Sequence, residues 1–357
     1  MINVILLSRS TLFSQPGGDT LQVEQTARYL SEVGCKVEIG LSGTSINFRQ
    51  FDLIHFFNLI RPADAREALN SGIPIIVSSI YHDYSEYDSK HRGSMAKVLF
   101  NVFGKHGLEY FKTIGRWVNG SDRFPGLSYL MKGQRRSMCD VLQKSKYLIA
   151  TSNQEIERIE SDLGKLPPAK KISLGSEHIS EGNTVAEREG VLCAARIEGP
   201  KNQLKLIRAL QNSAIPLHLT GNTATNQSAY FKQCKLEAHE NVHFHGRVSK
   251  EELTNLYQKC KVHALISYYE TTGLSTLEAL KMGCQVVITD RGAQKEIFGD
   301  HAFYCDPDDT QSIASAITRA LANNESHIEW VKDNFGWGKA AREILDIYQT
   351  VIDNTKS

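Results

Sequence analysis

The chain has 357 residues, of which 41% are hydrophobic and 23% charged, so it can bury a full core and is long enough for two domains. The formal net charge of +1 excludes an overall field that would draw the protein onto nucleic acid or another acidic polymer. Seven cysteines, none in a CxxC pair, argue against a disulfide framework and a zinc site, and they fit thiols in a reducing cytoplasm.

The N-terminal stretch MINVILLSRS predicts a buried strand rather than a signal peptide, because no basic region precedes its short apolar run. No other apolar run is long enough to span a bilayer. We therefore expect a cytoplasmic protein.

Short β-branched runs alternate with amphipathic stretches in the first half of the chain. Continuous apolar strands separated by helical patterns are typical of a parallel sheet covered on both faces, so residues 1–176 predict a doubly wound, Rossmann-like α/β domain. The expected strands are residues 2–8, 36–42, 52–58, 73–79, 147–152 and 171–175.

The polar segment 177–190 interrupts this pattern and predicts an interdomain linker. A second doubly wound domain is expected over 191–325, followed by a helical segment, 326–357, that could cross back to the first domain. Its expected strands are residues 191–197, 216–221, 242–246, 262–267, 285–289 and 302–306. Two such domains would face each other across a cleft, since ligands of open α/β sheets bind at the carboxyl ends of the strands. The absence of GxGxxG and of a P-loop argues against a dehydrogenase and a P-loop ATPase.

Two glutamates, Glu270 and Glu278, flank a turn in the stretch YYETTGLSTLEALKMG. Glu270 follows a predicted strand, Thr272 is the predicted N-cap of the next helix, and Gly273 would let a phosphate approach the free backbone N–H groups of its first turn. Glu278 could accept paired hydrogen bonds from ribose hydroxyls, and Glu270 could reach a sugar. The alternative is that Glu270 caps the turn and Glu278 is solvated.

A second pair of charged residues lies in AARIEGPKNQLKL, where Arg196 ends a predicted strand and Lys201 begins a predicted helix. Two cations on such a loop can neutralise a diphosphate, Arg as a bidentate fork and Lys as a point charge. The alternative is two surface cations.

Together these motifs resemble the retaining glycosyltransferases of the GT-B fold, family 4, whose E-x7-E motif precedes a small-residue stop and a strand. Here that run reads ETTGLSTLEALKMGCQVV, from Glu270 through Glu278. The preceding VHFHGRVSKEELTNLYQKCKVHALIS matches the family's strand-Gly-helix-strand run, and RIEGPKN matches its phosphate-binding segment. The chain departs from the family at Thr271 and Thr272, which replace a bulkier pair, and at Cys284, where proline is common.

The resemblance implies roles for individual residues in the second domain. Glu278 would hold the ribose hydroxyls of a nucleoside-diphosphate sugar, Arg196 and Lys201 the diphosphate, and Glu270 the donor sugar. Thr272 and the backbone amides of Gly273 and Leu274 would join the phosphate and sugar contacts. Since these cations and the helix N-terminus could stabilise the leaving group, no metal and no other cofactor is expected.

In the first domain, the resemblance places Gly17 and Gly18 in a glycine-rich loop that faces the donor, and His82 near the reacting sugar. The alternatives are an ordinary turn and a structural histidine.

Residues 88–136 form a long cationic insert with interleaved aromatic residues, which suits an anionic lipid surface. A helical insert with solvated charges is the alternative, and the absence of a recognition module argues against nucleic acid. The cations are Lys90, Arg92, Lys97, Lys105, Lys112, Arg116, Arg123, Lys132, Arg135 and Arg136.

The sequence therefore predicts a retaining, metal-independent glycosyltransferase that uses a UDP- rather than a GDP-sugar and a glycan acceptor, lipid-linked, in bacterial envelope polysaccharide or lipopolysaccharide synthesis. It would lie in the cytoplasm, peripheral on the inner face of the plasma membrane. One rival is a sugar-nucleotide epimerase of similar architecture, which would turn over without an acceptor. Another is a non-catalytic homologue, which would be expected to have lost part of the motif set.

Overall fold

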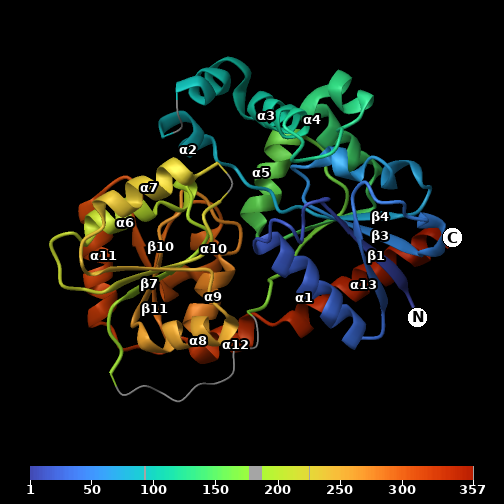
Figure 1. Ribbon diagram of the computed structural model, residues 1–357. Coiled ribbons are helices and arrows are strands. Elements are labelled where there is room, and N and C mark those ends of the chain that lie inside the picture. The colour runs from blue at the N-terminus through green and yellow to red at the C-terminus, as the bar shows by residue number, and fades with distance from the viewer. Residues whose placement is uncertain (92–93, 177–186, 225, 357) are drawn as a thin grey trace. The chain divides into compact units, whose positions relative to one another are not determined.

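Short buried apolar runs form two separate parallel β-sheets, each covered on both faces by helices (Figure 1). The computed structural model describes residues 1–91, 94–176, 187–224 and 226–356. One unit consists of Met1–Leu174 with Trp337–Ser357, and the other of Gly175–Gly336. The predicted α/β class with two Rossmann-like domains is confirmed.

The first sheet has the strand order β2-β1-β3-β4-β5-β6, and all neighbouring strands are parallel. The strands are β1 (Asn3–Ser8), β2 (Lys36–Leu41), β3 (Leu53–Phe57), β4 (Ile75–Ser78), β5 (Tyr147–Ala150) and β6 (Ala169–Lys171). The helices are α1 (Gly18–Glu32), α2 (Ser85–Lys90), α3 (Ser94–Val118), α4 (Leu127–Lys144), α5 (Asn153–Leu163) and α13 (Trp337–Lys356), with 3-10 turns at Phe48–Gln50, Pro62–Ala65 and Ala68–Asn70.

Side chains of β1 alternate between two cores because successive residues of a strand point to opposite faces. Val4 and Leu6 pack in one buried cluster with residues of α1 and α13. Ile5 and Leu7 pack in the other with residues of α4 and α5. Burial on both faces explains why this strand is a continuous apolar run in the sequence.

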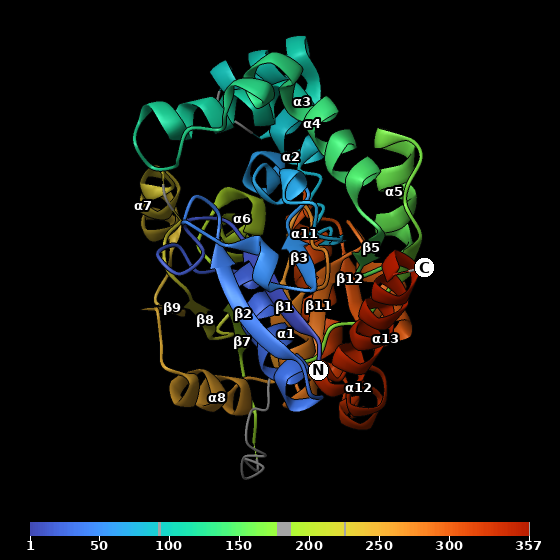
Figure 2. The ribbon, with the colours of Figure 1, turned by 90° about the vertical axis from the view of Figure 1, so that its right-hand side faces the viewer.

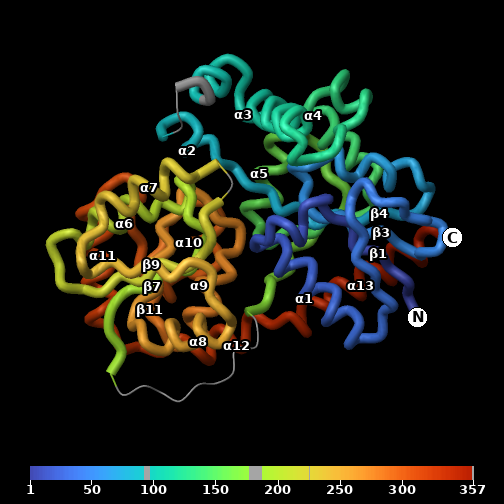
Figure 3. Tube along the Cα trace, in the orientation of Figure 1, coloured from blue at the N-terminus to red at the C-terminus, as the bar shows by residue number. Residues whose placement is uncertain are grey.

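The C-terminal helix α13 belongs to the first unit, where it lies beside α1 (Figure 3). Its Tyr348 hydroxyl lies 2.7 Å from Nδ1 of His55 on β3, and Nε2 of His55 lies 2.8 Å from the Ser78 hydroxyl. Burial lowers the pKa of His55 to about 3, so this ring is neutral. A buried hydrogen-bond chain thus fastens α13 to the sheet.

Between β4 and β5 the chain forms α2, α3 and α4, and α3 lies beside α4 (Figure 2). Gly104 (φ 64°) in α3 and Gly133 (φ 74°) in α4 have left-handed backbone, which residues with a Cβ rarely adopt. Both helices are therefore kinked. The predicted insert, 88–136, covers most of this segment, and its Arg92 lies outside the described residues.

The second sheet has the order β12-β11-β10-β7-β8-β9 and is also parallel. Its strands are β7 (Val191–Ala194), β8 (Leu217–Thr220), β9 (Val242–Gly246), β10 (Val262–Leu265), β11 (Gln285–Thr289) and β12 (Phe303–Cys305). Its helices are α6 (Gln203–Ala209), α7 (Ser228–Glu237), α8 (Lys250–Lys259), α9 (Leu274–Lys281), α10 (Gln294–Phe298), α11 (Thr310–Ala322) and α12 (Ile328–Asn334), with 3-10 turns at Gly199–Lys201 and Gly299–His301.

Each predicted strand has a counterpart, and β6 differs most from its prediction. It ends at Lys171, whereas the sequence predicts a strand over 171–175. Beyond the end of β6, Ile172 and Leu174 are buried in the core, and the Ile172 amide donates one more hydrogen bond to the Ala150 carbonyl oxygen on β5.

The unit boundaries differ from those expected at the linker and near the C-terminus. Most of the expected linker, 177–186, lies outside the described residues, but the Arg188 guanidinium donates to backbone carbonyls of Gln258 and Met282 within the second unit. The segment 326–357 is divided, because Val331 and Phe335 are buried in the second unit's core whereas α13 packs in the first.

Candidate active site

Three loops of the second unit carry polar side chains at one edge of the sheet. They follow β7, β10 and β11, which are neighbours in the order β11-β10-β7. The connection from β7 runs to β8 on one side, while β10 lies on the other, so the β10/β7 pair is the point where the strand order reverses. Open α/β sheets bind ligands outside the carboxyl ends of the strands at such a point.

Two predicted site residues meet at this edge. Nζ of Lys201, on the loop after β7, lies 2.5 Å from Oε1 of Glu270, on the loop after β10, and both side chains are largely buried. Gly292 (φ 69°) packs against the Glu270 backbone, because a Cβ there would lie 2.2 Å from the Glu270 carbonyl oxygen. The loop after β11 thus helps to fix Glu270.

Gly273 begins α9 in left-handed backbone (φ 71°, ψ 56°), and it is the N-cap residue. The prediction that Thr272 is the N-cap is therefore wrong. The Thr272 side chain is buried, and its hydroxyl makes no hydrogen bond with any described residue. Because glycine offers no side-chain cap, the first N–H groups of α9 depend on other partners.

Glu278 is buried within α9, so the alternative in which it is solvated is wrong. Its Oε2 accepts a hydrogen bond of 3.1 Å from the Tyr257 hydroxyl on α8. Burial, and then the neighbouring Glu278 carboxylate, raise the pKa of Tyr257 well above its ordinary value, so this hydroxyl stays protonated and donates.

Gln294, at the start of α10, has no counterpart among the predicted site residues. It is almost completely buried, yet neither its Oε1 nor its Nε2 has a hydrogen-bond partner in the described part of the chain. The buried Thr276 hydroxyl likewise has no hydrogen-bond partner among the described residues. Both flank Gly273, since a Cβ there would lie 3.0 Å from Gln294 Oε1 and 3.4 Å from Thr276 Oγ1. Buried polar groups are normally hydrogen-bonded, so these side chains can still form hydrogen bonds with a polar ligand or with water.

Arg196 follows β7 but does not join the Lys201–Glu270 pair. Its side chain is about half exposed, and Nη2 lies 3.2 Å from Oε1 of Glu198. Gln203 donates to the Arg196 carbonyl oxygen and so holds the backbone of this loop.

Gly17 and Gly18 begin α1 in the first unit. The Gly17 amide donates to the Thr20 hydroxyl, and this hydroxyl donates to the Leu12 carbonyl oxygen. A Cβ on Gly18 would meet no atom within 4 Å. The space beside Gly18 is therefore open.

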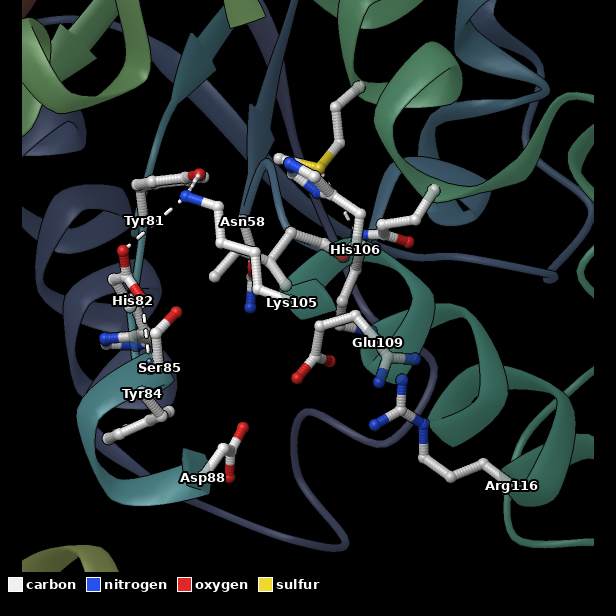
Figure 4. A pocket seen from close by; sticks show the side chains of 15 residues that line it. Asn58, Tyr81, His82, Tyr84, Ser85, Asp88, Lys105, His106, Glu109 and Arg116 are labelled. Carbon is white, nitrogen blue, oxygen red and sulfur yellow. Dashed lines mark hydrogen bonds and ion pairs between the residues drawn. The ribbon is translucent and has the colours of Figure 1, made fainter. Parts of the chain in front are cut away.

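His82 follows β4 and lines a pocket of about 200 Å³ within the first unit (Figure 4). Its ring stacks on Tyr84 with centroids 5.8 Å apart. Lys105 and Glu109 of α3 line the same pocket.

Several cations of the predicted insert point inward rather than to solvent. Lys105 lies 3.1 Å from Asp162 and 3.5 Å from Asp83. Lys112 lies 2.5 Å from Glu109 and 3.5 Å from Asp88. These two cations of the insert are therefore paired with acids of the first unit.

One Asp-x-Asp triplet, Asp306–Asp308, follows β12. Asp308 accepts from the Lys205 ammonium at 2.7 Å and from the Tyr268 hydroxyl at 2.7 Å. Over the described ranges, no group of three or more His, Cys, Asp or Glu side chains is placed to hold a metal ion.

Residues 176–337 match the family model described as glycosyl transferases group 1. The second unit is a group 1 glycosyltransferase domain. The chain is also similar to O-antigen chain mannosyltransferase B of Escherichia coli, with 27% identity over 135 residues, or 36% of this chain and 35% of the relative. The match therefore spans about a third of that relative's length.

Solved structures extend the similarity to both units of the chain. Sucrose-phosphate synthase from Thermosynechococcus elongatus superposes with a TM-score of 0.74 at 16% identity, covering 99% of this chain and 100% of that one. HepE from Anabaena, in complex with UDP, has a TM-score of 0.71 at 16% identity and covers 98% of this chain and 100% of that one. These similarities show a common GT-B fold.

None of the helices in the described residues combines the length and the apolar character needed to cross a membrane.

Proposed function

We propose that this protein is a retaining, metal-independent glycosyltransferase that moves a sugar from a nucleoside diphosphate, UDP rather than GDP, to a glycan acceptor. The observation that carries the proposal is that two sets of groups lie at the same edge of the second sheet, where the strand order reverses. One set is the Lys201–Glu270 ion pair, and the other is the buried polar groups of Gln294 and Thr276 beside Gly273, which have no hydrogen-bond partner among the described residues. A phosphorylated, hydroxyl-rich donor would supply the missing hydrogen bonds.

The departing diphosphate needs positive partners, because breaking the anomeric C–O bond leaves negative charge on its oxygens. Lys201 and the more exposed Arg196 follow the same strand, and the first N–H groups of α9 follow Gly273. The amide of Leu274 is one of them, and the Thr272 hydroxyl lies in the turn just before. These groups would stabilise the leaving group, as preorganised donors stabilise other developing anions.

Glu278 is the proposed ribose ligand, although its Oε2 already accepts from Tyr257. A carboxylate has about four lone-pair sites on two oxygens, so two vicinal hydroxyls can still bind. The Tyr257 bond would hold this carboxylate in place before the nucleotide arrives.

Glu270 would hold hydroxyls of the donor sugar, with His82 and the Gly17–Gly18 loop contributing from the first unit. In the proposed reaction the acceptor hydroxyl attacks the anomeric carbon on the face from which the diphosphate departs. The anomeric C–O bond to phosphate breaks, a C–O bond to the acceptor forms, and the hydroxyl proton passes to the departing phosphate oxygen. The anomeric configuration is therefore retained.

The proposed acceptor is a lipid-linked glycan of the bacterial envelope, in polysaccharide or lipopolysaccharide synthesis, and the O-antigen relative supports this assignment. Nine of the twelve large apolar side chains exposed in the described residues fall within residues 98–131. Exposed cations on the described parts of α3 and α4 are Lys97, Lys132, Arg135, Arg136 and Lys144, and Lys132 pairs with Asp140. An apolar surface with cations suits an anionic membrane, so we propose that the enzyme lies peripherally on the cytoplasmic face.

The donor is tested by thermal unfolding with UDP-glucose, GDP-mannose and related nucleotide sugars. A donor at about 100 times its Kd should stabilise the fold by about 2.7 kcal/mol. Purified product should keep the donor's anomeric configuration by NMR, and activity should persist in EDTA. Inversion, loss of activity that Mn²⁺ restores, or turnover of a nucleotide sugar without an acceptor would each contradict a part of the proposal.

A further inference from the structure

The pocket of the first unit lies where the ends of β3 and β4 meet α2 and α3 (Figure 4). Its volume of about 200 Å³ falls below the roughly 300–1,000 Å³ of pockets that hold drug-sized ligands. The pocket therefore suits a small ligand or one unit of a larger one. The lining residues used below are Asn58, His82, Tyr84, Asp88, Glu109 and Arg116.

Buried polar atoms of this lining that make no hydrogen bond within the described residues include the acceptor Oδ1 of Asn58 and the donor Nε of Arg116. The Arg116 Nε lies 3.8 Å from Oδ2 of Asp122, an ion-pair distance that is too long for a hydrogen bond. Asn58 also has left-handed backbone (φ 85°), which asparagine adopts more readily than most residues other than glycine. The pocket thus has one acceptor and one donor that could form hydrogen bonds with a ligand, while the charge of Arg116 is already balanced by Asp122.

The kink of α3 places the α3 side chains in this lining. Lys105 follows Gly104 directly, and Glu109 and Arg116 lie beyond it on the same helical segment. Replacing the left-handed glycine with a residue that carries a Cβ would strain this geometry.

The charges of the pocket balance. Asp83, Asp88 and Glu109 oppose Arg61, Lys105 and Arg116. Burial alone would lower the pKa of Arg61, but the carboxylates of Asp64 and Asp122 outweigh it and raise that pKa, so Arg61 is already paired. The lining therefore lacks an excess of cations for a phosphate or carboxylate.

Two rings form an apolar part of the same lining, since His82 stacks on Tyr84. The flat faces of these rings provide an apolar surface. The neighbouring carboxylates, carboxamide and guanidinium provide hydrogen-bond donors and acceptors. A sugar ring has C–H faces and a rim of hydroxyl groups, which is the complementary arrangement.

We propose that this pocket binds one uncharged sugar residue of the acceptor. The proposal rests on the function proposed above, which supplies a glycan acceptor. Hydroxyls of the sugar donate to Asn58 Oδ1 and accept from Arg116 Nε, while its C–H face lies on the His82 and Tyr84 rings.

Binding is tested by saturation-transfer NMR on the full chain with the methyl glycosides of mannose, glucose and galactose. The 6-phosphates of the same sugars are the charged comparison. At least one uncharged glycoside should bind, and its 6-phosphate should bind at least about tenfold more weakly, because no unpaired cation receives the phosphate. Absence of saturation transfer to every neutral glycoside, or equal binding of the phosphates, would overturn the proposal.

Two variants locate the binding. Asn58→Gly removes the carboxamide and still permits the left-handed backbone, and Glu109→Gln removes one charge at nearly constant shape. Asn58→Gly should weaken glycoside binding at least about tenfold, the equivalent of one lost hydrogen bond. Glu109→Gln should weaken it less, because Glu109 lines the pocket without an assigned hydrogen bond to the sugar. Glu67→Gln is the matched control, because Glu67 also pairs with a cation of this unit, Arg123, but does not line the pocket. Unchanged affinity in both pocket variants would place the sugar elsewhere.

The donor thermal shift separates this proposal from the proposed function. If a nucleotide sugar stabilises the protein and is transferred, but Asn58→Gly leaves the KM for the acceptor unchanged, the pocket assignment fails alone. If no nucleotide sugar binds, but a neutral glycoside does and Asn58→Gly abolishes this, the transferase proposal fails and the sugar pocket stands.

Discussion

Lys201 and Glu270 come from loops after two adjacent parallel strands, and their side chains form an ion pair of 2.5 Å. Each charge is largely buried and neutralises the other. Removing one partner leaves an uncompensated buried charge, so the effects of substituting Lys201 and Glu270 should depend on each other.

We predict that Lys201→Ala and Glu270→Ala each lower kcat/KM at least about tenfold, because one loses leaving-group stabilisation and the other a donor-sugar contact. The double variant should lose less than the product of the single effects, since the two residues interact. Steady-state kinetics of all three variants measures this coupling.

Lys205→Ala is the control for this pair, because Lys205 forms a similar ion pair with Asp308 and is not among the proposed site residues. It should keep nearly wild-type kcat/KM. Full activity of both single variants at Lys201 and Glu270 would exclude the pair from the reaction.

The hydrogen bond from Tyr257 to Glu278 predicts a stability effect. Tyr257→Phe leaves the buried carboxylate without this donor, which should destabilise the second unit by about 1–3 kcal/mol. Glu278→Ala should chiefly weaken nucleotide binding, as expected for a ribose ligand. Urea unfolding and nucleotide titration measure the two effects.

Tyr304→Phe is the matched control, since it removes an exposed hydrogen bond of 2.8 Å to the Gly299 carbonyl oxygen while leaving the partly buried ring in place. Its effect should stay within about 0.5 kcal/mol. If Tyr257→Phe is no more destabilising than Tyr304→Phe, the buried bond does not support Glu278.

Strands could be predicted from the sequence because burial on both faces makes them continuous apolar runs. The run NVILLS is β1 itself, and all but its first residue are buried. The position of α13 was harder to predict. Tyr348 reaches His55 across 293 residues of sequence, and no local pattern encodes that partner.

The candidate site likewise contains residues that the sequence could predict and residues that only the structure shows. Glu270, Lys201 and Gly273 lie just after strands, where the topology of a parallel sheet gathers functional residues, so sequence position points to them. Gln294 also follows a strand, but its importance depends on burial without a partner beside Gly273, which only the folded structure shows. Lys105 and Lys112 resemble surface cations in sequence because their acidic partners come from other segments as well as their own helix.

The free energy of unfolding should fall at acidic pH, because two buried histidines stay neutral in the folded chain. Burial lowers the pKa of His55 in the first unit and of His263 in the second to about 3, from the ordinary value of 6.5. In the unfolded chain these rings take up protons below about pH 6.5, whereas the folded chain resists this until about pH 3. Their contribution is therefore complete above about pH 6.5 and is lost as the pH falls toward 3, by up to about 1.4 kcal/mol per pH unit for each ring.

Urea unfolding at about pH 7.5 and about pH 5 measures this loss. His263→Leu should reduce the pH dependence of the second unit, because it removes a buried ring that cannot accept a proton in the folded state. His239→Leu, at an exposed position, is the control and should keep the wild-type dependence. Equal stability of the wild type at both pH values would contradict the mechanism.

The surface of α3 and α4 gives the last prediction, which concerns membrane binding. Lys97, Lys132 and Arg136 are exposed there, beside exposed apolar side chains such as Met131 and Val102. Replacing the three cations with Glu should release the protein from liposomes that contain acidic lipid, because each cation near such a surface contributes about 1 kcal/mol. Wild-type binding should also weaken with salt, since exposed charges act over only about 8 Å at physiological ionic strength.

The matched control for this prediction replaces Lys36, Arg49 and Lys165 with Glu. These residues are exposed in the same unit but lie outside the insert, and the change in net charge is identical. The control should keep liposome binding, and both triple variants should keep the donor thermal shift, because the proposed donor-binding residues of the second unit are untouched. Loss of liposome binding in both would mean that net charge, rather than this surface, holds the protein on the membrane. If the wild type ignores acidic liposomes, the exposed apolar surface of α3 and α4 must have another partner, and the peripheral location proposed above is wrong.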